Sequence, residues 1–259
     1  MKYFLRFLAC LLPVVANAGQ KPHATASWIA EKAEITADDP IRTVIRMTVD
    51  EGWHTYWENP GEGGLPLSIE AELPAGWSIG KIQYPVPKRF MTGELPGFGY
   101  EGGTLFPVTL TAPAGFRGNL PPLKASLSWL TCNDETCVPG EAELTFPTET
   151  DPGAVTAAYE KLPRALANSM LSVSRDGDNI FISLTLADNS ACNPESCELF
   201  PITHNVIDPA TEPRFKKSTD PENTWQASAP KSEYLSGKIG KFEILLVAPN
   251  GTASIATTD

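Results

Sequence analysis

Short runs of alternating apolar and polar residues, separated by clusters of Gly and Pro, recur along most of this chain. The sequence holds 24 Pro and 20 Gly among 259 residues, which is typical of a turn-rich β protein rather than a helical one. In the first half we expect strands at residues 43–49, 67–73, 104–111, 124–130 and 141–146. Strands of this length, broken by turns, predict a sandwich of two packed sheets.

The stretch from Asp151 to Met170 has a different pattern. Apolar residues recur there at roughly helical spacing, with Pro163 as a break, so we predict one or two short helices. The β pattern then resumes, with strands expected at residues 179–186, 225–229, 241–247 and 253–257 and a long loop at 207–221. The sequence thus predicts an all-β protein with one sandwich at 19–150, a helical linker at 151–170 and a second, smaller sandwich at 171–259.

The first 18 residues have the features of a cleavable export signal. Lys2 and Arg6 precede an apolar stretch, and Ala16-Asn17-Ala18 fits a cleavage site. The apolar stretch is too short to span a bilayer, and no later stretch is long enough to do so. We therefore expect an exported protein that loses Cys10 with its signal.

The charge of the chain excludes some classes of partner. The formal net charge is −11, and it becomes −13 without Lys2 and Arg6, because residues 1–18 contain no acid. This balance argues against nucleic acid and anionic lipid as partners. No Ser/His/Asp arrangement, pair of catalytic carboxylates or phosphate loop stands out, so hydrolase and nucleotide chemistry have no support.

Four cysteines remain after the signal, in two tight pairs: Cys132 with Cys137, and Cys192 with Cys197. Disulfides persist in exported compartments, but four cysteines allow three pairings, and the sequence does not choose one. A bridge within the first pair closes a six-residue ring, which the chain-entropy model values at about 2 kcal/mol. Such a bridge would stabilise the fold only slightly, and a chain of this length can be stabilised by its own hydrophobic core. A redox role for the pair therefore becomes more favoured. The two hexapeptides share Cys, Asn, Glu and Cys, which fits either a duplicated module or ordinary turn composition.

An ordered set of motifs runs through the first predicted sandwich. Its members are Gly52-Trp53-His54-Thr55-Tyr56-Trp57-Glu58-Asn59-Pro60-Gly61, Leu73-Pro74-Ala75-Gly76-Trp77, Tyr84-Pro85-Val86-Pro87-Lys88-Arg89, Gly99-Tyr100-Glu101-Gly102, Trp129-Leu130-Thr131-Cys132 and Cys137-Val138-Pro139. This set resembles the periplasmic N-terminal domain of the DsbD thiol:disulfide interchange proteins, and it is most similar to their suppressor-of-copper-sensitivity (ScsB-like) branch. The resemblance covers about residues 25–150 and extends weakly into the second unit at residues 198–201.

The resemblance implies a fold, a location and an activity. It implies immunoglobulin-like sandwiches in the periplasm and a thiol–disulfide oxidoreductase that needs no organic cofactor. Its partners would be thioredoxin-like periplasmic proteins and a membrane-embedded electron relay of the DsbD or CcdA type, in processes such as cytochrome c biogenesis and copper tolerance. We expect a monomer.

The resemblance also implies roles for particular residues. Cys137 would form the mixed disulfide with a partner, and Cys132 would resolve it. A cap loop over the pair would correspond to the segment from Phe90 to Tyr100, with Phe90, Phe98 and Tyr100 as its aromatic residues. The chain departs from the best-known member in that its cysteines are one residue closer and no relay follows before Asp259.

Other interpretations of the cysteines stay open from the sequence. Either pair could be a structural bridge, and for Cys192 and Cys197 this is the favoured interpretation, with a second disulfide as the expected form. Two close pairs also have ligand-like spacing for Zn²⁺ or Cu(I), so a non-catalytic interaction or copper-handling module is the alternative function. Asp134 and Glu135 would raise the thiol pKa, and no cation lies near in sequence. His54, among aromatic residues, is interpreted as part of a packing cluster.

Overall fold

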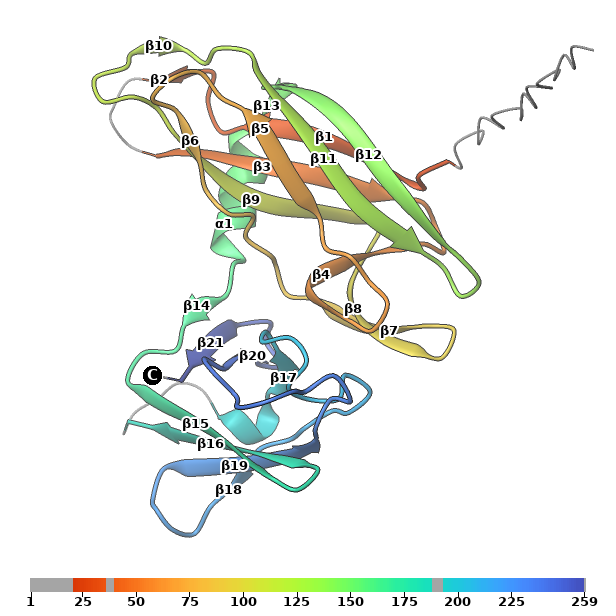
Figure 1. Cartoon of the computed structure of the whole chain (residues 1–259). Helices are drawn as coiled ribbons and strands as arrows, with labels where there is room; N and C mark the ends of the chain where they lie inside the picture. The colour runs from red at the N-terminus through yellow and green to blue at the C-terminus, as the bar shows by residue number, and fades with distance from the viewer. Residues whose placement is uncertain (1–20, 36–39, 188–192, 259) are drawn as a thin grey trace, which may run out of the picture.

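The computed structural model describes residues 21–35, 40–187 and 193–258. In this part of the chain two β-sandwiches lie one below the other, joined through helix α1 (Pro152–Glu160) (Figure 1). The all-β class predicted from the sequence, with a short helical connection, is confirmed. The predicted export signal at 1–18 lies outside the described residues. Within the described ranges, no helix has the length and apolar character needed to span a bilayer.

The first sandwich packs a five-stranded sheet against a six-stranded sheet. The five-stranded sheet has the order β13 (Glu149–Thr150), β1 (Ala24–Ala30), β3 (Ile41–Val49), β9 (Gly103–Thr111), β6 (Ser78–Ile79). The six-stranded sheet has the order β12 (Cys137–Phe146), β11 (Leu123–Cys132), β4 (His54–Gly61), β8 (Leu95–Glu101), β7 (Lys88–Thr92), and β5 (Ser68–Glu72) pairs with β11 beside β4. A short ribbon is formed by β2 (Glu34–Ile35) and β10 (Gly118–Asn119).

Burial explains why some strands alternate cleanly in sequence and others do not. In β11 buried and exposed residues alternate, because one face lies on the core and the other faces solvent. In β3 one face is buried throughout, and the other is buried at Val44, where α1 covers the outer face of the sheet. There Val155 and Ala158 of the helix pack on Ile29 and Val44. The helix begins at an N-cap, where Asp151 Oδ1 accepts a hydrogen bond from the Ala154 amide at 2.9 Å.

The second sandwich is smaller and has two four-stranded sheets. One has the order β14 (Arg164–Ala165), β21 (Ala253–Thr257), β20 (Glu243–Val247), β17 (Glu198–Pro201). The other has the order β15 (Ser169–Asp176), β16 (Asn179–Leu186), β19 (Thr224–Pro230), β18 (Lys216–Lys217). A single 3-10 turn, η1 (Pro194–Ser196), precedes β17.

The connection between the sandwiches is only partly helical. Helix α1 ends at Glu160, before Pro163, and β14 and the start of β15 occupy the rest of the predicted linker. Proline lacks the amide hydrogen that a continuing helix needs, so the second half of the segment joins the second sandwich as strand. The domain limits at 19–150, 151–170 and 171–259 stay predictions.

The two sandwiches are packed against each other through aromatic residues. Phe200 of the second sandwich contacts Trp57 and Phe98 of the first, with ring centroids 6.2 Å and 5.8 Å away. The side-chain amide of Asn59 donates a buried hydrogen bond of 2.7 Å to the Pro201 carbonyl. Phe200 therefore belongs to the hydrophobic core of the first sandwich.

Candidate redox site

The first cysteine pair closes the end of a β-hairpin. Strands β11 and β12 pair along their whole length, and the last pair in the register is Cys132 with Cys137. Their sulfur atoms are bonded at 2.03 Å. Cys132 is fully buried, whereas Cys137 is exposed. The two sulfurs of one ring thus differ in access to a partner protein.

The turn between the two cysteines is held by Asn133. Its side-chain oxygen accepts hydrogen bonds from the amides of Glu135 and Thr136, at 2.9 Å and 2.8 Å. The Asn133 amide in turn donates to the Thr136 carbonyl at 3.0 Å. An asparagine that bonds its own backbone in this way stabilises a tight turn, so the loop has a defined shape around the ring.

A histidine from another strand lies beside Cys132. In the ladder between β11 and β4, Cys132 is directly opposite His54, and directly opposed residues place their side chains on the same face of a sheet. His54 is 6% exposed, and its Nε2 hydrogen-bonds Thr92 Oγ1 at 2.9 Å. The Tyr56 hydroxyl reaches the same Thr92 oxygen at 3.3 Å. The sequence shows His54 only as part of an aromatic run, because the sheet register that brings it to Cys132 has no local signal.

Burial decides the charge state of His54. It lowers the pKa of the imidazole, and the nearby carboxylates of Glu101 and Asp134 only partly oppose this shift. The ring is therefore neutral at pH 7. It can exchange a proton or a hydrogen bond with its surroundings, but it supplies no positive charge that would stabilise a thiolate.

The β7–β8 hairpin forms the edge of the same sheet, next to β4. Phe90 of β7 lies on the His54 ring, with centroids 3.8 Å apart, and contacts Tyr56 edge-on at 5.5 Å. At the tip of the hairpin, a Cβ placed on Gly93 would be 3.6 Å from the Asp134 carbonyl, so the tip touches the loop between the cysteines. This hairpin is the segment predicted as a cap, and its Phe90 and Thr92 contact His54, the residue opposite Cys132.

The three aromatic residues predicted for the cap have different positions. Phe90 is half-buried beside His54. Phe98 is buried at the contact between the sandwiches, near Trp57 and Phe200. Tyr100 is buried in the first sandwich, and its hydroxyl donates to the Pro85 carbonyl at 2.8 Å. Of the three, Phe90 contacts His54, the residue opposite Cys132.

Of the second cysteine pair, the structure describes Cys197 alone. Cys192 lies outside the described residues, so the expected second disulfide stays a prediction. Cys197 is buried at the end of η1, and its sulfur is 3.3 Å from the Asn193 carbonyl. Asn193 Oδ1 accepts from the Glu195 amide at 3.3 Å, as Asn133 does in the first hexapeptide. The two segments therefore share an Asn-held turn, although one is a β-hairpin and the other a 3-10 turn.

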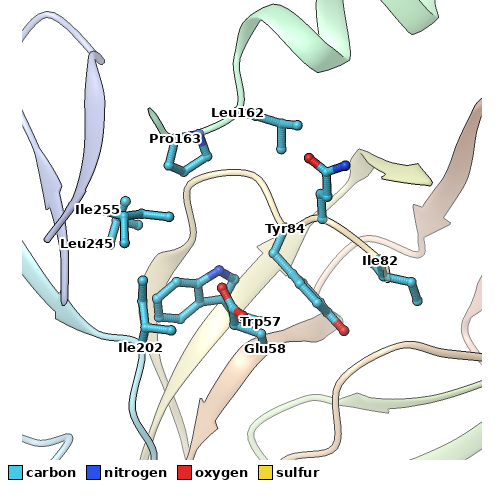
Figure 2. Close-up of a pocket in the computed structure, with 10 residues that line it drawn as sticks. Trp57, Glu58, Ile82, Tyr84, Leu162, Pro163, Ile202, Leu245 and Ile255 are labelled. Carbon is cyan, nitrogen blue, oxygen red and sulfur yellow. The ribbon is translucent and has the colours of Figure 1, made fainter. Parts of the chain in front are cut away.

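A cavity of about 210 Å³ lies where the two sandwiches meet. Figure 2 shows its walls: Trp57 and Glu58 from β4, Tyr84 from the first sandwich, Pro163 from the connection, and Ile202 close to β17. Burial, with repulsion from Glu243, raises the pKa of Glu58. The cavity is separate from the disulfide. Its Glu58 lies four residues along β4 from His54, and His54 is the residue opposite Cys132.

Metal binding was a further interpretation of the cysteines. Among residues 21–35, 40–187 and 193–258, no three His, Cys, Asp or Glu side chains converge in a way that could hold a metal ion.

The first sandwich thus has an immunoglobulin-like fold with a disulfide at the end of its β11–β12 hairpin, and comparisons with known proteins find similar domains. The family model for the N-terminal domain of thiol:disulfide interchange protein DsbD matches residues 23–149. This match supports a DsbD-type N-terminal domain at residues 23–149.

One solved structure resembles almost the whole chain. The N-terminal periplasmic domain of ScsB from Proteus mirabilis superposes with a TM-score of 0.66 and 17% sequence identity, and the match covers 92% of this chain and 94% of that one. At this identity the likeness concerns the fold, which it extends over both sandwiches. No curated protein matches the chain in sequence.

Proposed function

We propose that this chain is a periplasmic thiol–disulfide oxidoreductase of the protein-disulfide reductase type. It passes reducing equivalents from a membrane-embedded electron relay to thioredoxin-like proteins through Cys132 and Cys137. The observation that carries this proposal is the unequal burial of the two cysteines within one hairpin ring. A structural staple needs no such difference, whereas exchange needs one accessible sulfur.

In the proposed reaction the two cysteines act in sequence. The Cys137 thiolate attacks one sulfur of the partner's disulfide, and the partner's other sulfur leaves as a thiolate and takes up a proton. Cys132 then loses its proton and attacks Cys137 Sγ, which breaks the mixed disulfide and releases the second partner thiolate. The partner gains two electrons and two protons, and the ring closes between Cys132 and Cys137. The membrane relay supplies two electrons to reopen it.

The surroundings of the ring fit this order of events. Neutral His54 lies beside Cys132 and can accept the proton that Cys132 loses. The Asn133 turn holds the two cysteines at the closed end of the hairpin. Asp134 and Glu135 are exposed beside Cys137 and disfavour a free thiolate there, so reaction with small oxidants is slow until a partner docks.

Stoichiometric exchange with a thioredoxin-like protein tests this function. The reduced mature chain is mixed with an oxidised periplasmic thioredoxin-like protein, quenched with acid, alkylated and analysed by mass spectrometry. We expect electron transfer at least a hundredfold faster than reduction of the same partner by an equal concentration of glutathione. The Cys137→Ser variant is the control and should show no acceleration. A wild-type rate equal to that of glutathione would contradict the proposal.

A further inference from the structure

Strand β7 carries an arginine that reaches across to the second sandwich. The guanidinium of Arg89 donates to three backbone carbonyls there: Leu199 at 2.6 Å, Thr211 at 3.1 Å and Pro209 at 3.4 Å. A planar guanidinium can satisfy several acceptors at once because its donors point in fixed directions. One side chain therefore joins β17 and the loop before β18 to the edge strand of the first sandwich.

The same guanidinium lies between two aromatic rings. Its central carbon is 4.9 Å from the Phe98 ring centroid and 4.8 Å from that of Phe200, which are distances of favourable cation–π contact. One ring belongs to each sandwich. Burial lowers the pKa of Arg89, and the Glu212 and Glu198 carboxylates oppose this shift. The arginine is thus a built part of the contact between the sandwiches and not a surface charge.

The neighbouring residues of β7 point the other way. Successive side chains of a strand alternate between its two faces. Arg89 faces Phe98 and the second sandwich, whereas Phe90 and Thr92 contact His54 beside Cys132. Strand β7 therefore contacts the second sandwich through Arg89 and His54 beside Cys132 through Phe90.

We propose that Arg89 is a positioning residue through which the second sandwich holds the β7–β8 hairpin over Cys132. With the tether in place, Phe90 and Thr92 stay on His54, and Cys132 stays buried while Cys137 is open. Without it, the edge strand keeps its pairing with β8 and the contacts of Phe90 and Thr92 with His54, and the cover over Cys132 opens more often. The second sandwich then helps to position the redox site, although no residue of the second sandwich belongs to that site. This role rests on the proposed function, because cover over Cys132 matters when the pair exchanges electrons.

Alkylation of Cys132 tests the tether without any partner protein. The full mature chain carries Cys137→Ser, so that Cys132 is the remaining thiol of the ring, and its reaction with iodoacetamide is followed by peptide mass spectrometry. We expect Arg89→Gln to speed the alkylation of Cys132 at least fivefold. Arg89→Lys should give an intermediate rate, because lysine keeps the positive charge but lacks the planar guanidinium that donates to several carbonyls at once.

The matched control is Lys88→Gln. Lys88 is the residue before Arg89, and its ammonium meets only the exposed Glu101 carboxylate, at 3.6 Å, in a pair that is open to solvent. Its removal takes away the same charge and should change the alkylation rate less than twofold. Faster hydrogen exchange of the β7 amides in Arg89→Gln, with unchanged exchange in the β16 and β20 amides, should accompany the effect.

Two results would overturn the proposal. One is equal alkylation of Cys132 in Arg89→Gln and Lys88→Gln when both are folded. If Arg89→Gln does not fold, Arg89→Lys and Phe200→Leu decide, and rates within twofold of the unmodified Arg89 chain for both would also overturn it. The experiment is separate from the exchange function: a chain that fails to reduce a thioredoxin-like protein can still show the alkylation effect, and the reverse also holds.

Discussion

Replacement of Cys132 by Ala is expected to leave a stable covalent adduct between Cys137 and thioredoxin-like proteins. The exposed Cys137 can still attack a partner disulfide, but the sulfur that would resolve the mixed disulfide is missing. Adducts should accumulate in periplasmic extract to at least ten times their level with the unmodified chain. They are seen on non-reducing gels, disappear with reductant, and can be identified by peptide mass spectrometry.

The reciprocal variant is the control for this experiment. Cys137→Ala leaves the buried Cys132 as the one cysteine of the ring, which a folded partner cannot reach, so it should trap no more than background. If the adducts instead form through Cys132 and require the loss of Cys137, the assignment of the two roles is reversed. If neither variant traps a protein, exchange with partners is not the function of this pair.

Gly99→Ala is expected to destabilise the first sandwich by about 3 kcal/mol or more, because it adds a methyl group where there is no room. A Cβ at Gly99 would lie 1.9 Å from the Thr55 carbonyl oxygen and 2.9 Å from the Phe90 ring. Gly99 pairs with Tyr56 of β4 on one side and with Lys88 of β7 on the other. The clash therefore separates the strands that carry His54 and the hairpin over Cys132.

Urea unfolding followed by fluorescence measures this effect. Gly103→Ala is the matched control, because a Cβ there meets nothing within 4 Å and its φ is not in the left-handed region. It should stay within about 0.5 kcal/mol of the unmodified protein. Equal midpoints for the two variants would show that the close approach of β8 to β4 is not a constraint on the fold.

Strands in which apolar and polar residues alternate could be predicted from the sequence. Strands that are buried on both faces and contain Pro and Gly could not. Strand β16 has the predicted bounds, and β11 has them within two residues at each end, because each exposes polar residues from one face. Strand β4 was not predicted as a strand: it contains Pro60 and Gly61 and is buried on both faces, so neither composition nor period signals it. Strand β8 was also not predicted, because it contains Pro96, Gly97 and Gly99. Its glycines allow the Phe90 ring and β4 to come close.

The candidate site was predictable where its residues are adjacent in sequence. Cys132 and Cys137 face each other across a hairpin whose turn residues are all local, so their spacing favoured a ring, although the sequence left three pairings open. His54 and Thr92 reach the site only through the register of β11 with β4 and of β7 with β8. Arg89 is part of the same motif set that carried the family resemblance, yet its role depends on carbonyl oxygens of the other sandwich. No residue pattern in a single sequence reports such backbone acceptors.

The two hexapeptides show the limit of local similarity. Asn133 and Asn193 each bond the backbone amide two residues later. One turn joins two long strands, and the other is a 3-10 turn before the short β17. The identical residues of the two hexapeptides therefore predict the same hydrogen bond within the turn. The secondary structure around each turn differs, and it determines the surroundings of the cysteines.

The reduction potential of the Cys132–Cys137 pair tests the central claim most directly. The chain is equilibrated in redox buffers of defined potential, alkylated and digested, so that the peptides with Cys132 and Cys137 are scored separately from those with Cys192 and Cys197. We predict a potential above about −300 mV, in the range of pairs that exchange electrons with protein partners. A potential below that value would mark a structural disulfide and would contradict the account.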